Sequence, residues 1–324
     1  MPLLPSTYRA PWGLRDGHRQ TVLGAFRPAP ALRYERERLD TPDGDFLDLD
    51  WLAANPARPL VVISFGMEGH AQRPYVRGMA AAFRAAGWDA LVWHYRSTSG
   101  EPNRKLHFYH SGLVEDLELV LAHARQRGYT QLFLVGFSLG GNLTLNYLGR
   151  RGTAVPSDVR GAAVFSVPCE VMDCAQRLRE PANQIYTRRF LESFREKIRA
   201  KMPHWPGRIS DADYESIRTL EDYDARYTAP HFGFPDVPTF YRAVSSRYVL
   251  AGITRPTLMV NALDDPFMGP LCHPAEIAEH HPCLHLEQPA HGGHQGFLRG
   301  PWHRWNWCEE RAVQFAVARL PAPA

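Results

Sequence analysis

Apolar residues along the chain fall into short continuous runs separated by segments with a helical period. Residues 60–65 are apolar almost throughout, a pattern typical of strands buried on both faces of a parallel sheet. Between such runs, apolar residues recur every three or four positions and a glycine follows, as at 75–86, 113–127 and 139–151. Strands that alternate with helices predict a parallel sheet covered by helices on both faces. The other predicted strands lie at residues 88–95, 131–137, 161–167, 256–262 and 283–287.

Two features precede this alternation at the N-terminal end. Residues 1–30 contain five prolines, so we expect an irregular arm that lies over the domain. Residues 32–39 and 46–52 flank the turn sequence Thr-Pro-Asp-Gly-Asp at 41–45. Two such runs around a turn predict an antiparallel hairpin that leads into the parallel sheet.

The alternation stops between residues 168 and 250. Within this segment, residues 186–198 carry an aromatic or aliphatic side chain at every fourth position among many charged residues, which predicts an amphipathic helix. A segment of this length is too long for a plain connection, so we expect 168–250 to form a helical lid over the active site. Residues 31–167 and 251–324 then form the core. The basic helix could also touch a membrane surface, but its interspersed acidic residues favour packing on the core.

The predicted strand at 131–137 runs into Gly136-Phe137-Ser138-Leu139-Gly140, which matches the pattern G-x-S-x-G. This short pattern arises by chance in many surface turns, and it gains meaning only from its context. Here a strand precedes it and a helix follows, as in the turn that presents the nucleophilic serine of α/β-hydrolases. We therefore predict an α/β-hydrolase fold with a mostly parallel central sheet, in which Ser138 is the nucleophile.

A serine hydroxyl needs a histidine base, and the base needs a carboxylate that fixes its tautomer and stabilises its charge. In this fold the acid and the histidine follow the serine in that order along the chain. Asp265 ends the predicted strand at 256–262, and His294 lies in a glycine-rich loop after the last strand. Asp264 is the alternative acid, although the reach of the strand and the turn at Pro266 favour Asp265.

Several other histidines lie close to His294 in the sequence and are alternatives for the base. Clustered histidines can also indicate a metal site. No carboxylate or cysteine stands at ligand spacing, so we expect no metal and no cofactor, and we interpret most of these histidines as surface or packing residues. They are His273, His280, His281, His285 and His291.

Ester attack also needs donors for the oxyanion that forms at the carbonyl. One donor should be the backbone N–H of Leu139, the residue after the nucleophile. The other should come from the loop after the strand at 60–65, which reads Gly66-Met67-Glu68-Gly69. Its position in that loop makes the Met67 N–H the expected second donor.

Composition narrows the class of protein and its partners. The chain has 324 residues, 44% of them hydrophobic and 22% charged, and a net charge of +3, which does not indicate a nucleic-acid partner. Its five cysteines form no metal or redox motif and are odd in number, which favours free thiols in a reducing compartment. We see neither a signal peptide nor a spanning apolar run, so we expect a soluble cytoplasmic protein.

Beyond the serine turn, further motifs are spread over most of the chain. They are Gly17-His18-Arg19-Gln20-Thr21, the stretch 96–104, Tyr109-His110-Ser111-Gly112 with Asp116, the stretches 136–142, 261–267 and 292–297, and, near the end of the lid, 228–230, 233–234 and 241–245. Together they resemble the YheT-like branch of the α/β-hydrolases, which groups bacterial hydrolases with eukaryotic abhydrolase-domain esterases and phospholipases. The resemblance implies Ser138, Asp265 and His294 as the triad and carboxylic-ester hydrolysis as the activity.

The chain departs from that family pattern in two places. It has Phe65-Gly66 where the family usually has His-Gly, and Arg96-Ser97-Thr98 where the family usually has Arg-Gly-Cys. Phe65 could change the oxyanion loop or make the acyl pocket more apolar. His110 with Asp116 suggests the His/Asp pair of acyltransferases, but the spacing is imperfect and favours a structural role at the start of a helix.

The sequence as a whole predicts a serine carboxylesterase that works through an acyl-enzyme on a small-molecule ester. The aromatic and aliphatic lid favours short- to medium-chain or lipid-like esters. Two alternatives stay open: an acyltransferase that uses the same triad, and a catalytically silent α/β-hydrolase module that serves as an interaction surface.

Overall fold

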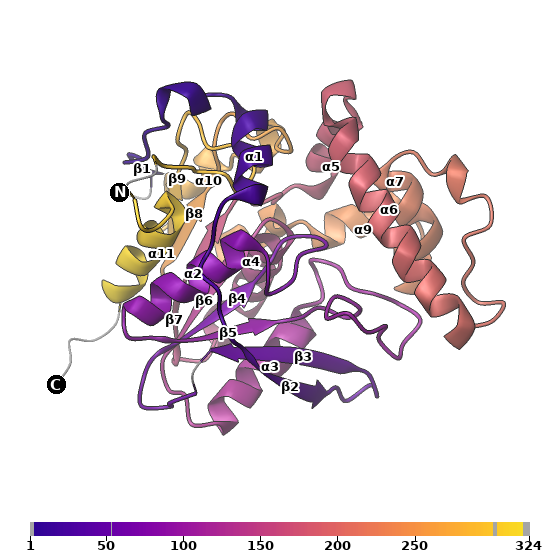
Figure 1. Ribbon diagram of the computed structural model, residues 1–324, viewed down its shortest axis with the longest axis horizontal. Coiled ribbons are helices and arrows are strands. Elements are labelled where there is room, and N and C mark those ends of the chain that lie inside the picture. The colour runs from indigo at the N-terminus through magenta and orange to yellow at the C-terminus, as the bar shows by residue number, and fades with distance from the viewer. Residues whose placement is uncertain (1–2, 53, 301–302, 320–324) are drawn as a thin grey trace.

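The fold is built on a nine-stranded sheet in the computed structural model, which describes residues 3–52, 54–300 and 303–319. The order of the strands is β1-β9-β8-β7-β6-β4-β5-β3-β2, and the sheet is parallel except that β3 runs antiparallel to both β2 and β5. This arrangement confirms the predicted α/β fold and the N-terminal hairpin (Figure 1). The strands are β1 (Leu3–Leu4), β2 (Glu35–Asp40), β3 (Phe46–Leu52), β4 (Leu60–Ser64), β5 (Asp89–Trp93), β6 (Leu132–Phe137), β7 (Val159–Phe165), β8 (Thr257–Val260) and β9 (Leu284–Glu287).

Helices cover both faces of the sheet because the chain reverses direction across it. The step from β4 to β5 moves toward one edge, and the steps from β5 to β6 and β7 move toward the other. Right-handed crossovers therefore place α2 on one face and α3 and α4 on the opposite face. The last helix, α11, contacts α2 and so shares its face. These helices are α2 (Pro74–Ala85), α3 (Val114–Gln126), α4 (Leu139–Arg151) and α11 (Trp307–Val317).

The N-terminal segment is more regular than the expected irregular arm. Leu3 and Leu4 form β1 and pair in parallel with β9. Residues Gly17–Phe26 form helix α1, whose N-cap Asp16 accepts a hydrogen bond from the Arg19 N–H at 2.8 Å. A Cβ on Gly17 would lie 1.9 Å from the carbonyl oxygen of Asp264, so this helix packs directly on core backbone. Such packing through glycine leaves no apolar stripe, which is why the sequence pattern did not reveal the helix.

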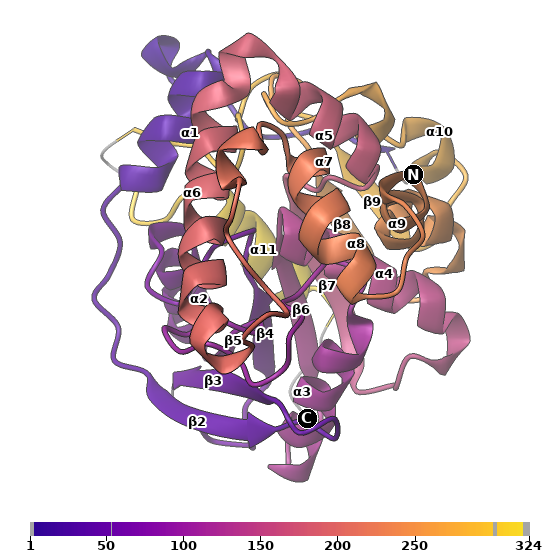
Figure 2. The same ribbon diagram turned by 90° about the vertical axis from the view of Figure 1, so that its right-hand side faces the viewer.

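Between β7 and β8 the chain forms a group of helices in place of strands, as Figure 1 shows at the right of the molecule. The predicted amphipathic helix is α6, which buries Leu191, Phe194 and Ile198. Figure 2 shows α6 next to α1, and the two helices touch where the Tyr186 hydroxyl lies 3.1 Å from His18 Nδ1. The helices are α5 (Val171–Arg179), α6 (Gln184–Lys201), α7 (Leu220–Tyr223), α8 (Ala229–His231) and α9 (Val237–Val244), and the short α10 (Ala275–Ala278) follows β8.

A buried arginine ties the hairpin turn to the start of α3. Arg96 donates to both carboxylate oxygens of Asp116, at 2.9 and 2.8 Å, and to Asp43 and Asp45 at 2.7 and 3.1 Å. Arg96, Asp45 and Asp116 are all buried. Asp116 therefore braces α3 against Arg96, which matches the structural role expected for it rather than a pairing with His110.

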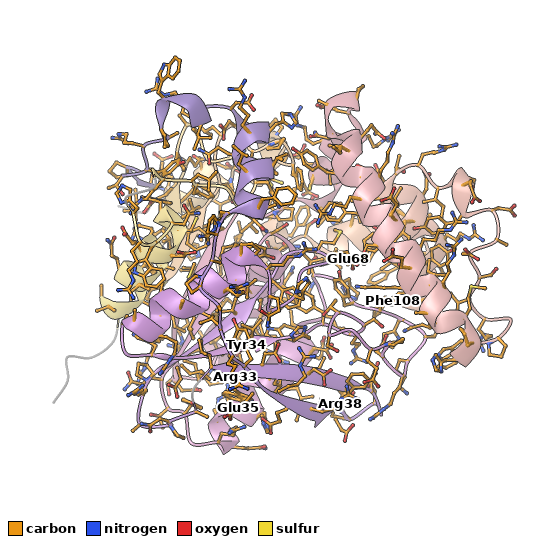
Figure 3. The ribbon with its side chains drawn as sticks, in the orientation of Figure 1. Arg33, Tyr34, Glu35, Arg38, Glu68 and Phe108 are labelled. Atoms are coloured by element: carbon orange, nitrogen blue, oxygen red, sulfur yellow. The ribbon has the colours of Figure 1, made fainter. Side chains whose placement is uncertain are left out.

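We expect Arg96→Met to destabilise the fold by about 3–5 kcal/mol, because two buried carboxylates would lose their cation. The free energy of unfolding at neutral pH, from urea titration, measures this loss. Arg33→Met is the matched control, because Arg33, which is labelled in Figure 3, is exposed and takes part in no salt bridge among the described residues. A loss below about 1 kcal/mol for Arg96→Met, the upper end of the range for surface pairs, would contradict the expectation.

Candidate active site

Ser138 sits on a sharp turn between β6 and α4, in a backbone conformation that non-glycine residues rarely adopt. Its φ is 51° and its ψ is −120°. Such a conformation costs on the order of 1–3 kcal/mol and persists only where the surroundings impose it. Here its N–H donates to the carbonyl of Phe165 at 2.9 Å. A Cβ on Gly140 would lie 2.3 Å from the carbonyl oxygen of Ser64, so the glycine lets α4 start directly against β4.

The structure brings Ser138, His294 and Asp265 together in one hydrogen-bonded chain. The distance from Ser138 Oγ to His294 Nε2 is 3.0 Å. The other ring nitrogen, Nδ1, lies 2.9 and 3.2 Å from the two carboxylate oxygens of Asp265. A carboxylate only accepts, so Nδ1 carries a proton and Nε2 of the neutral ring is free to accept from the serine hydroxyl.

Three segments that are distant in sequence hold the histidine in this orientation. The His294 N–H donates to Thr21 Oγ1 of α1 at 2.9 Å, and the Gln295 N–H donates to Ser166 Oγ after β7 at 2.9 Å. The Phe267 ring stacks on the imidazole with centroids 4.0 Å apart. These positioning contacts were not predicted. Thr21 lies in one of the motifs quoted for the family resemblance, and that was the only signal for it.

The neighbouring aspartate has a different set of partners. Asp264 Oδ1 accepts the Gly293 N–H at 2.9 Å, and its Oδ2 lies 3.3 Å from His291 Nδ1. Asp264 thus braces the backbone of the histidine loop and does not contact His294. Burial raises the pKa of Asp264, and the Gly293 N–H and His291 partly oppose that effect.

The two expected oxyanion donors flank the serine. Leu139 is the first residue of α4, where a helix leaves its N–H groups without an internal partner. The Gly66–Gly69 loop packs against the serine so closely that a Cβ on Gly66 would lie 3.2 Å from Ser138 Cβ. Within the described chain, the N–H groups of Met67 and Leu139 donate to no other group.

Phe65, where the chain departs from the family pattern, lies beneath the oxyanion loop. Its ring is fully buried against Tyr95, with centroids 4.6 Å apart, and its carbonyl accepts from the Tyr95 hydroxyl at 2.6 Å. The Phe65 ring lines neither the cleft that contains Ser138 nor the neighbouring apolar cavity that Leu139 lines. Phe65 thus supports the loop from the core side and does not make the pocket wall.

Two cavities meet at the Gly66–Gly69 loop. The outer cleft opens between α1, α6 and the loop, and Ser138 and His294 line it. The inner cavity lies under the helices of 171–244 and is mainly apolar. Met67 and Glu68 line both cavities, and Leu139 lines the inner one. The inner walls include Phe108, Phe194, Leu220, Tyr223, Tyr227, Phe232, Phe240 and Val244.

Burial disfavours charge on two titratable groups that line the inner cavity, Asp224 and His110. It raises the pKa of Asp224 to about 6, although the Tyr241 hydroxyl donates to that carboxylate at 2.8 Å. It lowers the pKa of His110 to about 3. A cavity that pushes acids and bases toward their neutral forms is suited to an apolar group.

Neither a metal site nor a membrane-spanning helix is found within the part of the chain that the structure describes. No three His, Cys, Asp or Glu side chains there gather closely enough to hold a metal ion. None of the helices there is both long and apolar enough to cross a bilayer.

Comparison with known proteins places the chain among hydrolases. Residues 55–231 match the family model described as serine aminopeptidase, S33. The predicted esterase YheT of Escherichia coli is 34% identical over 96% of this chain and 93% of its own length. Human phospholipase ABHD3 is 29% identical over 98% of this chain and 80% of its own length. Among solved structures, the esterase Pf2001 of Pyrococcus furiosus covers 97% of this chain with all of its own, at a TM-score of 0.60 and 11% identity, which supports the fold alone.

Proposed function

Because this chain belongs to the YheT-like family of α/β-hydrolases, whose members include esterases, we propose that it is a serine carboxylesterase. Its substrates would be short- to medium-chain or lipid-like carboxylic esters, hydrolysed through an acyl-enzyme. The observation that carries the proposal is the 3.0 Å contact between Ser138 Oγ and His294 Nε2, with Asp265 on the other ring nitrogen.

In the first half of the reaction, His294 Nε2 takes the proton of Ser138 while Oγ attacks the ester carbonyl. Asp265 keeps the proton on Nδ1 and stabilises the imidazolium that forms. The carbonyl oxygen becomes an anion, which the N–H groups of Met67 and Leu139 stabilise. When the tetrahedral intermediate collapses, the bond to the alkoxy group breaks, His294 protonates the leaving alcohol, and Ser138 carries the acyl group.

Water completes the cycle by the same route. His294 removes a proton from a water molecule, and the resulting oxygen attacks the acyl carbonyl at the same oxyanion site. Collapse of this second intermediate returns the proton to Ser138 and releases the carboxylic acid. The wide outer cleft on the histidine side supports water entry at this step.

Each segment of the chain has its own role in this reaction. Residues 31–167 and 251–324 act as the α/β-hydrolase core, and residues 168–250 act as a lid that shields the serine. The arm at 1–30 supports the histidine loop through Thr21.

Five free cysteines support a reducing compartment such as the cytoplasm.

We expect Ser138→Ala to lower kcat on p-nitrophenyl esters by about 10⁴-fold or more, because the nucleophile is lost. Labelling by a fluorophosphonate probe, which reacts only with an activated serine, should disappear in the same variant. Turnover or labelling that persists in folded Ser138→Ala protein would refute the proposal.

The adjacent aspartates offer a matched pair of variants. Asp265→Asn should lower kcat by about 10³–10⁴-fold, because an amide no longer holds His294 in the required tautomer. Asp264→Asn should stay within about tenfold of the parent, because its amide oxygen can still accept the Gly293 N–H. Steady-state kinetics on one ester measures both, and the reverse order of effects would assign the acid to Asp264.

The inner cavity should bind the acyl chain of the substrate. We expect kcat/KM to rise by about fourfold per methylene up to the length that the cavity accepts, because each buried CH₂ contributes about 0.8 kcal/mol. Val171→Trp, on the cavity wall, should shorten the preferred chain. Gln176→Trp, on the exposed side of the same helix, is the control. An unchanged length profile in Val171→Trp would show that the acyl chain binds elsewhere.

A further inference from the structure

Glu68 connects the oxyanion loop to helix α6, a contact that the reaction steps above do not use. It follows Met67 directly, and its backbone has a φ of 57°, in the left-handed region that is unfavourable for a residue with a side chain. Only 7% of its side chain is exposed. Figure 3 shows Glu68 in the space between the core and α6. A buried carboxylate on an unfavourable backbone requires several partners to hold it.

On the core side, one tyrosine hydroxyl is hydrogen-bonded to both the backbone and the side chain of Glu68. The Glu68 N–H donates to the Tyr109 hydroxyl at 3.0 Å, and that hydroxyl donates to Glu68 Oε1 at 2.7 Å. Burial and the nearby carboxylate raise the pKa of Tyr109 well above its usual value, so the hydroxyl keeps the proton that it donates. On its other flank the loop is fixed by the Gly66 N–H, which donates to the Tyr75 hydroxyl at 3.0 Å.

On the lid side, Glu68 binds two residues one turn apart on α6. Lys197 Nζ donates to Glu68 Oε1 at 2.6 Å, and the Ser193 hydroxyl donates to Oε2. Burial lowers the pKa of Lys197, and the Glu68 carboxylate opposes that effect. Glu68 is thus the ion-pair partner of this largely buried lysine.

Glu68 also lies where the two cavities meet. It lines both the outer cleft, with Ser138, and the inner cavity, with Leu139. Lys197 lines the inner cavity and Ser193 lines the outer cleft. The Glu68–Lys197 pair thus forms part of the wall between the two cavities, beside the Met67 N–H.

We propose that Glu68 is a positioning residue, which holds the Met67 N–H toward the oxyanion by fastening the loop to Tyr109 and to α6. This inference rests on the esterase activity proposed above. Without these hydrogen bonds, residue 68 would relax to a negative φ, and the backbone of the Gly66–Gly69 loop, including the Met67 N–H, would shift with it. The loop would then hold its donor in the wrong direction even though Ser138 and His294 stay in place.

Such a role predicts a particular kinetic pattern. The oxyanion exists in the transition state and not in the bound ester, so a misplaced donor lowers kcat and leaves KM nearly unchanged. Loss of an oxyanion donor typically costs about 10²–10³-fold in kcat, and a displaced donor should cost less. We expect Glu68→Ala to lower kcat on p-nitrophenyl acetate by about 10- to 100-fold, with KM within about threefold.

The decisive measurement adds a conservative variant and a transition-state analogue. Glu68→Gln keeps an oxygen for the Tyr109 hydroxyl, so it should recover most of the kcat that Glu68→Ala loses. A trifluoromethyl ketone, whose tetrahedral adduct places an oxyanion at the site, should lose affinity for Glu68→Ala by about the same factor as kcat. Rates are normalised to active sites counted by complete fluorophosphonate labelling. Glu196→Gln, exposed on α6 beside Lys197, is the control and should match the parent.

The kinetics of these variants test whether Glu68 positions the Met67 N–H. A kcat within twofold of the parent in Glu68→Ala, or a loss confined to KM, would overturn the inference. If Glu68→Ala does not fold, Tyr109→Phe removes the shared hydroxyl alone and must show the same fall in kcat at constant KM. An inactive Ser138→Ala beside a fully active Glu68→Ala refutes the role of Glu68 and leaves the proposed esterase intact, whereas an active Ser138→Ala refutes both.

Discussion

The geometry of the site depends on the close contact between the first turn of α4 and the carboxyl end of β4. Gly140 allows that contact, because any side chain there would collide with the Ser64 carbonyl. With the helix seated against the strand, the turn at Ser138 is forced into its unfavourable conformation and the loop after β4 lies directly beside it. One backbone packing constraint thus brings Ser138 next to the Gly66–Gly69 loop, and the hydrogen bonds to Gly66 and Glu68 then hold that loop in place.

The histidine is placed in a different way, by parts of the chain that come together only in the folded protein. Thr21 of the N-terminal helix and Ser166 after β7 each accept an N–H from the 294–295 backbone. Asp265 and Phe267 approach the imidazole from the loop after β8. Several contacts from separate elements fix the ring in one orientation. The geometry of the site therefore depends on the whole fold and not on one sequence motif.

Sequence patterns predicted the parts of the structure for which each pattern has a single structural explanation. Continuous apolar runs located strands β4 to β9, and a strand, a serine turn and a helix in succession located Ser138. Residue order then indicated Asp265 and His294, and the structure brings these side chains together. The sequence was silent where the cause is a tertiary contact. Helix α1 packs through Gly17 and carries no apolar stripe, and the partners of Glu68 lie 41 to 129 residues away along the chain.

Helix α6 shows why an amphipathic pattern did not describe how the helical segment 168–250 is attached to the core. Its apolar stripe is divided between two contacts. Tyr186 packs on Phe267 beside the histidine, whereas Phe194 stacks on Tyr223 within the helical segment itself. The attachment to the oxyanion loop uses polar side chains instead.

Ser193, Lys197 and Lys201 stand four residues apart on α6 and so lie on one face of the helix. The first two bind Glu68, and Lys201 donates to Asn103 and to the carbonyl of Lys105, both on the loop before α3. Hydrogen bonds are directional, and a buried donor without an acceptor costs about 1–3 kcal/mol. A slide of α6 along the core would leave these donors unpaired, whereas an apolar stripe would tolerate it. These polar contacts therefore fix the register of α6 against the loop that carries the Met67 N–H.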